Sequence, residues 1–389
     1  MNRRRVSTVA ALAAVSSFAW SHAFAADDTL VIGAAVALTG GLAYSDVPAS
    51  KGMELAVDEI NAAGGIGGKI KIELRTKDVR SDPAQAAVAA QELIDDGIDV
   101  LVTPCDADPS IGAGQIAQSA GVPAFSTCAS SPTLTVAVGD HMFLNFPGDN
   151  VQSAVSATYA IDQGYKTAYI LVSPDTAYTQ LPYYFKEAFE KLGGTVIAED
   201  SYSMGQQDFS AQVTKIQGLD PRPDVIMTAA YEPDFPAFIK QLRAAGLDIP
   251  VIGSDGIDSP TTFALGQAVD GVVFTTAGFA ADGNPLDVYN KKYEAKYGAA
   301  PDTIYTAIGY DLVKVIEAAV LAAGSTEPDA VWQAIRGLEN VQGATSKITY
   351  KGTNGVPIRE VAIVRIEDGN RQLVRQASPD ATLVPEPRL

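Results

Sequence analysis

Hydrophobic and polar positions in the first part of the chain alternate between the period of a strand and the period of a helix. Residues 30–37 form an apolar run and residues 70–74 alternate apolar with polar, so both are predicted as strands. Residues 51–62 carry apolar side chains at helical spacing and stop at Gly64 and Gly65, which predicts a helix. Further strands are predicted at residues 100–103 and 122–126, and further helices from Asp82–Pro83 onward and at residues 111–119. Short connections join these elements, which is typical of βαβ units with a parallel sheet between helices.

The alternation stops at residues 143–150 and then restarts, which predicts a second α/β lobe. Its predicted helices are residues 151–162, 183–192, 209–216 and 235–245, and its predicted strands are residues 167–172, 195–199, 225–228, 250–252 and 271–275. Three more helices follow at residues 285–297, 305–323 and 328–338. The pattern ends in a predicted hairpin, residues 361–366 and 372–374, around the turn residues Asp368, Gly369 and Asn370.

Ligands of open α/β sheets bind beyond the carboxyl ends of the strands, so the segments after the predicted strands are candidates for a site. These segments are residues 38–46, 104–110, 126–132, 173–178, 229–233 and 253–257. Their Gly, Asp, Ser and Pro residues are equally typical of turns, so position alone does not distinguish a binding loop from a connection.

The first 25 residues have the three parts of a secretory signal peptide. Arginines at positions 3–5 precede an apolar run at residues 6–20 and the small-x-small ending Ala23-Phe24-Ala25. The run is shorter than the roughly 20 residues of a membrane-spanning helix, although a retained anchor is the alternative. We therefore expect the working protein to begin near Ala26 and to act outside the cytoplasm, in the periplasm if the source is Gram-negative. No cysteine stands at the junction to carry a lipid anchor.

The length and net charge of the chain indicate how many domains it has and which classes of partner it can bind. Removing the first 25 of 389 residues leaves 364, a length that favours two domains. Without the three arginines, 25 basic residues face 46 acidic ones, a net charge of −21. That charge repels phosphate backbones and anionic lipid, so we expect neither nucleic acid nor a membrane surface as partner.

The two cysteines, Cys105 and Cys128, each directly follow a predicted strand of the first lobe. The ends of neighbouring strands lie within reach of a disulfide, and an exported protein can form one. A free buried pair is the alternative. Too few ligands surround the cysteines for a structural zinc site, and no metal is expected.

Candidate chemistry for an enzyme is weak. Beyond residue 25 a single histidine remains, His141, and any Ser-His-Asp or Cys-His site would have to use it. The glycine-rich residues 64–69 depart from the phosphate-loop pattern, and Asp106 with Asp108 is too few acids for a calcium site. We expect no catalytic residue and no cofactor. A sensory ectodomain is another class, but no transmembrane helix follows.

Two sequence stretches carry a resemblance to a known family: GAAVALTG at residues 33–40 and GMELAVDEINAAGGI at residues 52–66. They resemble the opening of type I periplasmic solute-binding proteins, in particular the branched-chain amino acid (Leu/Ile/Val) binding proteins of ABC importers. Asp78, Asp82–Pro83 and the YTAIGYD stretch at residues 305–311 continue the match. The resemblance covers residues 30–374.

The resemblance implies two Rossmann-like lobes joined by three hinge crossovers, closing on a small ligand like a clamp. The first lobe would comprise residues 26–147 with 278–351, and the second residues 148–277 with 352–389. The implied function is to capture an amino-acid-like ligand and deliver it to inner-membrane ABC permease subunits, without catalysis. A monomer is expected.

The resemblance also implies a set of ligand-binding residues. In the small-residue loop Cys128-Ala129-Ser130, Cys128 would offer its carbonyl to an ammonium group, and Ser130 its N–H and hydroxyl to a carboxylate. Asp255 matches the acid that pairs with the ammonium. The other matched positions are Tyr44, Asp106, Asp108, Tyr178 and Tyr231, of which the three tyrosines would form aromatic walls.

Asp106 departs from the family pattern, which has Ser or Thr there to donate a hydrogen bond to the ligand's α-carboxylate. An ionised Asp can only accept, and two carboxylates about 4 Å apart repel by roughly 4 kcal/mol at an effective dielectric near 20. If Asp106 points inward, the site suits an amine or another ligand without a free α-carboxylate. If Asp106 instead caps the following helix, an ordinary amino acid still fits.

Overall fold

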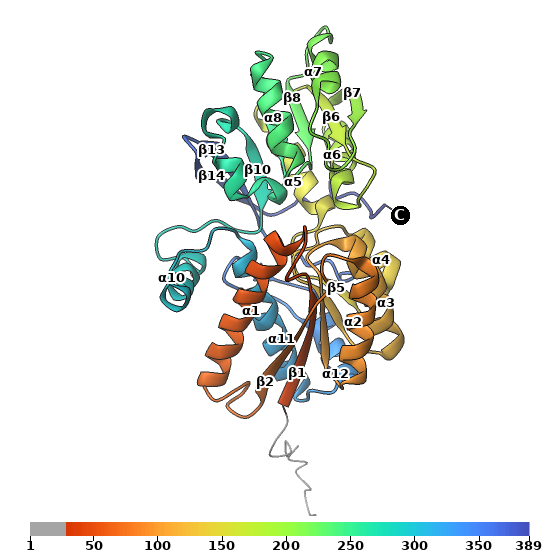
Figure 1. Ribbon diagram of the computed structural model, residues 1–389, viewed down its shortest axis with the longest axis vertical. Coiled ribbons are helices and arrows are strands. Elements are labelled where there is room, and N and C mark those ends of the chain that lie inside the picture. Colours follow the sequence, from red (N-terminus) through yellow and green to blue (C-terminus); the bar gives the residue numbers. More distant parts are fainter. Residues whose placement is uncertain (1–28, 389) are drawn as a thin grey trace, which may run out of the picture.

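Two β-sheets organise the protein in the computed structural model, which describes residues 29–388 (Figure 1). The first sheet is parallel throughout, in the order β2-β1-β3-β4-β5. The second has the order β14-β13-β10-β9-β8-β6-β7, in which β13 is antiparallel to both β10 and the edge strand β14. The predicted α/β class with two lobes and a late hairpin is confirmed.

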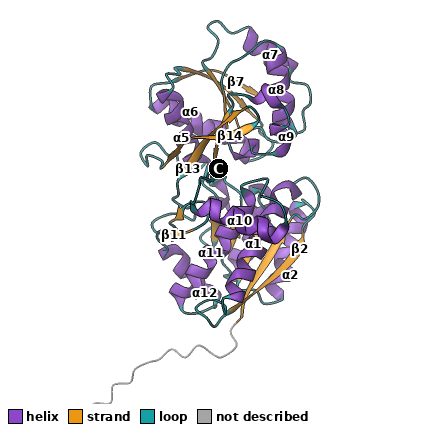
Figure 2. Cartoon of the chain, turned by 90° about the vertical axis from the view of Figure 1, so that its left-hand side faces the viewer, coloured by secondary structure: helices purple, strands orange, loops and turns teal. Residues whose placement is uncertain are grey.

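The two lobes lie end to end along the long axis and meet at a narrow waist (Figure 2). The strands of the first lobe are β1 (Thr29–Val36), β2 (Lys71–Asp78), β3 (Val100–Thr103), β4 (Ala124–Ser126) and β5 (Met142–Leu144). Its helices are α1 (Ala43–Ala62), α2 (Pro83–Asp95), α3 (Ala107–Ala120), α4 (Thr133–Val138), α10 (Pro285–Tyr297), α11 (Tyr305–Ala323) and α12 (Pro328–Gly337). A small ladder, β11 (Val341–Gln342) with β12 (Lys347–Ile348), follows α12.

The strands of the second lobe are β6 (Thr167–Val172), β7 (Thr195–Ser201), β8 (Val225–Thr228), β9 (Val251–Gly253), β10 (Val273–Thr276), β13 (Val361–Glu367) and β14 (Asn370–Ala377). Its helices are α5 (Asp149–Asp162), α6 (Leu181–Lys191), α7 (Ser210–Gln217), α8 (Asp234–Ala244) and α9 (Pro260–Phe263), with single 3₁₀ turns η1 (Tyr178–Gln180), η2 (Asp255–Ile257) and η3 (Gly266–Val269).

The chain passes between the two lobes three times: between β5 and α5, between β10 and α10, and between β12 and β13. The predicted lobe boundaries fall within these three passages and stay a prediction. The predicted signal peptide, residues 1–25, lies outside the described residues.

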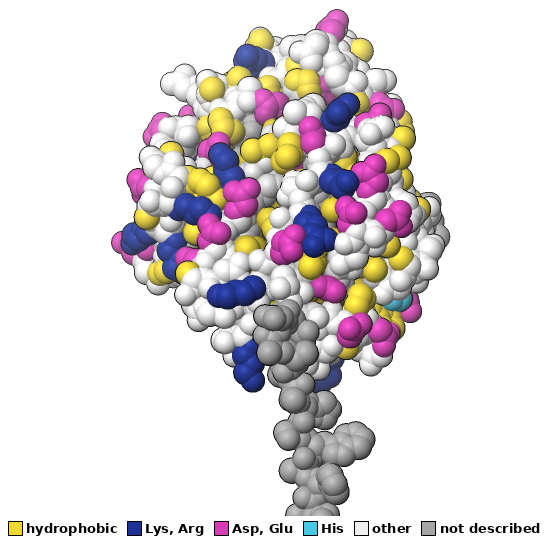
Figure 3. Space-filling model, turned by 60° about the horizontal axis from the view of Figure 1, so that its bottom comes forward, with side chains coloured by type: hydrophobic (Ala, Val, Ile, Leu, Met, Phe, Trp, Pro, Cys, Tyr) yellow, Lys and Arg dark blue, Asp and Glu magenta, His cyan; other side chains and the backbone are white. Residues whose placement is uncertain are grey.

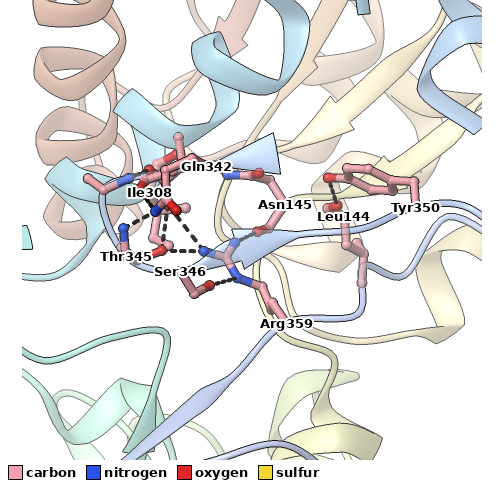
Figure 4. A network of polar contacts seen from close by, with 11 residues as sticks. Leu144, Asn145, Ile308, Gln342, Thr345, Ser346, Tyr350 and Arg359 are labelled. Carbon is pink, nitrogen blue, oxygen red and sulfur yellow. Dashed lines mark hydrogen bonds and ion pairs between the residues drawn. The ribbon is translucent and has the colours of Figure 1, made fainter. Parts of the chain in front are cut away.

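A buried ion pair joins two of the passages to α11. Arg359 and Asp311 have fully buried side chains, with Arg359 Nη2 3.1 Å from Asp311 Oδ2. The Arg359 guanidinium also donates to the carbonyl of Asn145 and to the hydroxyls of Thr345 and Ser346 (Figure 4). The passage after β5 and the passage before β13 are therefore held to α11 by one polar network.

Helices α1 and α11 cross at glycines. A Cβ built on Gly52 would lie 1.7 Å from the carbonyl oxygen of Thr306, and one on Gly309 would lie 1.9 Å from that of Ala49. Only glycine permits such an approach of two backbones. The close crossing matters for the site because α1 carries Tyr44 and α11 begins with Tyr305.

The C-terminal segment, residues 378–388, returns to the waist and contacts both lobes (Figure 1). The carbonyl of Pro385 accepts from Asn150 Nδ2 at 2.9 Å, and the N–H of Arg388 donates to the Tyr184 hydroxyl at 2.8 Å. The carbonyl of Arg388 accepts from the hydroxyl of Thr133 in α4.

Several helices begin earlier than predicted. The helix predicted at residues 51–62 is present, but its predicted start was wrong: α1 begins at Ala43 and contains Pro48, a residue type that usually ends a helix. Helix α3 begins at Ala107 rather than at residue 111, with Asp106 as its N-cap. The short α4 and β5 were missed because neither is long enough to show a period.

The face at the first-lobe end of the molecule carries basic and acidic side chains side by side (Figure 3). Ion pairs such as Lys77–Glu92, Lys292–Glu59 and Lys296–Asp58 account for part of this mixture in the first lobe. Across the described part of the chain, no helix combines the length and the apolar character that crossing a membrane requires.

Candidate functional site

The first turn of α1 is fixed by a buried carboxylate. Asp46 accepts hydrogen bonds from the N–H groups of Ala37 and Cys105, both at 2.7 Å. It therefore ties the end of β1 to the loop that follows β3. The same turn places the ring of Tyr44 at the waist, where it faces tyrosines of both lobes.

Asp106 follows β3 as the N-cap of α3. Its Oδ1 accepts from the N–H of Asp108 at 3.0 Å, and the residue also lines a cavity between the lobes. The helix cap is therefore confirmed, and the capping residue also belongs to the cavity wall. The contact of Asp106 with a ligand stays a prediction. Asp108, two residues further, reaches across the waist, and its Oδ2 accepts from the N–H of Ala177 at 3.4 Å.

The predicted disulfide is confirmed: Cys105 and Cys128 are bonded, with their Cα atoms 4.3 Å apart. The bond connects the loop after β3 to the loop after β4, and these strands are neighbours in the sheet. The small residues Ala129 and Ser130 follow on the second loop and are buried. Two segments of the cavity wall are thereby covalently joined.

In the second lobe a tyrosine and an acid are held by one set of hydrogen bonds. The Tyr178 hydroxyl contacts Ser254 Oγ at 2.6 Å and accepts from the N–H of Gly256 at 2.8 Å. Asp255 is buried and lies on the 3₁₀ turn after β9. Its Oδ2 accepts from the Tyr305 hydroxyl at 3.2 Å, which links the second lobe to α11 of the first.

Four tyrosine rings surround the space between these groups. Tyr44 and Tyr231 come from opposite lobes and lie within 22° of parallel, with ring centroids 6.5 Å apart. Tyr305 meets Tyr44 edge-on at 6.2 Å, and Tyr178 meets Tyr231 edge-on at 5.6 Å. Such rings can bury the apolar part of a ligand or attract a cation to their faces.

Burial keeps the acids of the site from ionising as readily as they do in water. Burial raises the pKa of Asp255 to about 7, although hydrogen bonds from Gln152 and Tyr305 act in the opposite direction. Burial also raises the pKa of Asp46 to about 7. Burial and the nearby charge of Asp108 raise the pKa of Asp106 to about 6.

Asp149, the first residue of α5, is a further buried acid beside the loop after β4. Its N–H donates to the Ser130 carbonyl at 2.7 Å, but no well-directed hydrogen bond from the described residues reaches either carboxylate oxygen. Burial raises its pKa well above the ordinary range, and the Ser130 hydroxyl opposes that shift.

These groups enclose a narrow cavity of about 30 Å³ between the lobes, which is room for roughly two water molecules. Its lining residues are Tyr44, Ser45, Cys105, Asp106, Ala107, Cys128, Ala129, Ser130, Ser131, Tyr178, Tyr231, Asp255 and Tyr305. Entry of a larger ligand requires that the lobes separate or the rings move.

The cavity brings together eight of the nine residues predicted for the ligand site: Tyr44, Asp106, Cys128, Ala129, Ser130, Tyr178, Tyr231 and Asp255. Asp108 is the ninth; it contacts the opposite lobe rather than lining the cavity.

Tyr305 and Asp149 were missed by the sequence reasoning. Asp149 is the first residue of α5, which directly follows a passage between the lobes, and Tyr305 is the first residue of α11, the second helix after another passage. The start of a helix close to a passage is the signal that could have indicated them.

His141 lies away from the cavity, stacked on Trp332 with ring centroids 4.8 Å apart. Within residues 29–388, no group of three or more His, Cys, Asp or Glu side chains is arranged to hold a metal ion.

Comparison with known proteins identifies a matching family and similar chains. The family described as periplasmic binding protein matches residues 29–371. A curated relative, Leu/Ile/Val-binding protein homolog 3 of Brucella melitensis biotype 1, is 30% identical over 372 residues, covering 95% of this chain and 98% of the relative.

Two solved structures show the same architecture. A leucine-binding protein from Thermotoga maritima MSB8 superimposes with a TM-score of 0.81 at 27% identity, over 90% of this chain and 99% of that one. The substrate-binding protein of a branched-chain amino acid transporter from Streptococcus pneumoniae, in complex with isoleucine, gives a TM-score of 0.79 at 25% identity, over 90% of this chain and 99% of that one.

Proposed function

The chain belongs to the periplasmic binding protein family, and on that premise we propose that it captures a small ligand carrying an ammonium group between its lobes and delivers it to an ABC permease. One observation carries the proposal: polar and aromatic side chains from both lobes converge on the narrow cavity that Asp106, Asp255 and the tyrosines line. Its relatives include proteins named for binding leucine, isoleucine and valine, which supports an amino-acid-like ligand.

The acceptors of the cavity suit an ammonium group. Asp255 offers a carboxylate that is already oriented by the Tyr305 hydroxyl, and the loop at Cys128 offers a backbone carbonyl. A buried ammonium needs such paired partners to replace its hydration. The facing rings of Tyr44 and Tyr231 cover the ligand from opposite lobes when these are closed.

Contacts that span the waist connect binding to closure. The Tyr305–Asp255 hydrogen bond, the Tyr44–Tyr231 ring pair and the Ala177–Asp108 contact all exist only when the lobes meet. A ligand that touches both walls adds to these contacts and shifts the equilibrium toward the closed state. The permease then receives a closed, loaded protein.

The remaining parts of the proposal concern setting and chemistry. The protein acts in the periplasm after removal of its signal peptide, as a monomer. It performs no catalysis: its role is to bind, close and release.

A thermal-shift screen of amino acids, amines, amides, aromatic acids and sugars tests the proposal, because a ligand that binds only the folded state raises the unfolding temperature. We expect a hit whose effect is lost in Tyr178→Ala or Asp255→Ala and kept in Asp82→Ala, an exposed acid at the start of α2. Hits unaffected by both cavity substitutions would contradict this site.

A further inference from the structure

The walls of the cavity carry negative groups and no compensating positive one. Asp106 and Asp255 line the cavity, and none of the described lining residues is Lys, Arg or His. Behind the wall, the buried Asp149 lies next to Ser130, the residue matched to the family's carboxylate-binding position. A ligand carboxylate at Ser130 would therefore be the third or fourth acid in one enclosed space.

The N-terminus of α3 already holds a carboxylate. Helix N-termini attract anions through their free N–H groups, and here Asp106 Oδ1 accepts the N–H of Asp108. The chain thus supplies, from its own side chain, the negative group that a ligand would otherwise bring to this helix. A ligand carboxylate arriving there meets an acceptor instead of a donor.

The aromatic groups complete a surface suited to a cation. Tyr44 and Tyr231 face one another across the waist with centroids 6.5 Å apart, so a group between them lies within cation–π range of both rings. Tyr305 and Tyr178 close the sides. Acids and ring faces together form the kind of environment that stabilises organic cations.

From this arrangement we infer that the ligand is a small organic cation without a free carboxylate, an alkylamine or guanidine, and that Asp106 is the residue that selects against amino acids. The inference rests on the proposed function and narrows its substrate class. Two like charges about 4 Å apart at an effective dielectric near 20 correspond to about a thousandfold in affinity, which is the upper limit of this selection.

Matched pairs of compounds isolate the carboxylate. Calorimetric titrations would compare leucine with 3-methylbutylamine, phenylalanine with phenethylamine and arginine with agmatine, each pair differing by one carboxylate. The pH is held near 8, above the pKa of about 6 of Asp106. We expect the tightest binder to be an amine, at least tenfold tighter than its parent amino acid.

The Asp106→Ser variant tests the assigned residue and keeps the helix cap, since serine caps as well as aspartate does. We expect it to weaken the amine and strengthen the parent amino acid, which reverses the preference within the pair. Asp82→Ser is the matched control, because it makes the same change at the exposed N-cap of α2 and leaves the preference as it is.

The acidity of the site adds a second readout. Amine binding weakens as the pH falls through about 7 and then about 6, because Asp255 and then Asp106 become protonated. A ligand carboxylate gains a hydrogen-bond donor from protonated Asp106, so the advantage of the amine over its parent amino acid narrows as the pH falls through about 6. The titratable groups that face Asp106 are Asp108 on its own helix, Asp46 and Tyr44 on α1, Tyr231 after β8, and Asp149 on α5.

Wild-type protein that binds leucine or another parent amino acid more tightly than its amine, with no gain from Asp106→Ser, would overturn the inference and leave the proposed function intact. If no pair binds, denaturing the protein purified from its native cells releases whatever it carries for mass spectrometry. A released amine without a carboxylate supports the inference, and a released carboxylate overturns it. A protein that neither carries nor binds any small molecule would overturn both proposals.

Discussion

Buried acids make the stability of the ligand-free protein depend on pH. Burial raises the pKa of Asp255 and of Asp46 to about 7, whereas the unfolded chain releases these protons near pH 4. The folded state therefore holds protons that the unfolded state has lost, and the stability present below about pH 4 declines as the pH rises to about 7. We expect the unfolding temperature of ligand-free protein to fall across this window.

Asp255→Asn should make the unfolding temperature fall less steeply between about pH 4 and 7, since an amide has no proton to lose. Asp82→Asn serves as the control, because Asp82 is exposed. Thermal unfolding followed by circular dichroism at several pH values measures both. An unchanged slope in Asp255→Asn would contradict the assignment.

Arg359 stabilises the waist through its buried ion pair with Asp311 as well as through packing. Replacing it with Met leaves Asp311 buried without its cation, a change that typically costs about 3–5 kcal/mol. We expect urea unfolding of Arg359→Met to show a loss of this size, and the double variant with Asp311→Leu to recover part of it. Equal losses in single and double variants would show that the pair contributes nothing beyond packing.

The crossing of α1 and α11 fixes two tyrosines of the site. A Cβ on Gly309 would lie 1.9 Å from a backbone oxygen of α1, so Gly309→Ala forces the helices apart, at a cost of about 1–3 kcal/mol. Because Tyr44 and Tyr305 lie on these helices, ligand affinity should fall as well. Gly112→Ala in α3 is the matched control: its Cβ meets Ala87 at 3.5 Å, an ordinary contact, and should be neutral or stabilising. Chemical denaturation and calorimetry on both variants measure the difference.

Long elements were predictable from the sequence, and helix starts at the waist were not. The apolar run of β1 and the periodic face of α11 show their own periods. The start of α1 does not, because Pro48 lies in its second turn and its first turn is held by Asp46, whose partners Ala37 and Cys105 come from other segments.

The residues of the site also divide into those that could be predicted from the sequence and those that could not. The segments that hold Ser130 and Asp255 were candidates because they follow strands, and the family resemblance named these two residues within them. Tyr305 and Asp149 reach the waist only through contacts between segments far apart in sequence.

The C-terminal segment links the lobes at the waist. Its Arg388 contacts Thr133 of the first lobe and Tyr184 of the second, and the guanidinium lies 5.1 Å from the ring centre of Tyr183. Truncation after Ala377 should therefore lower the unfolding temperature and raise the rate of ligand release, because the closed state loses a contact that spans both lobes. Stopped-flow displacement compares the truncated and full-length chains. Equal release rates would show that the segment is only a surface covering.

The proposed function depends on closure of the two lobes on a ligand held between them. Small-angle X-ray scattering on protein freed of ligand by unfolding and refolding, and then saturated with the strongest hit of the thermal-shift screen, tests it most directly. We expect a smaller radius of gyration in the saturated protein, and a smaller change when Tyr178→Ala removes a wall of the cavity. A radius of gyration that stays unchanged at saturation would rule out closure on the ligand.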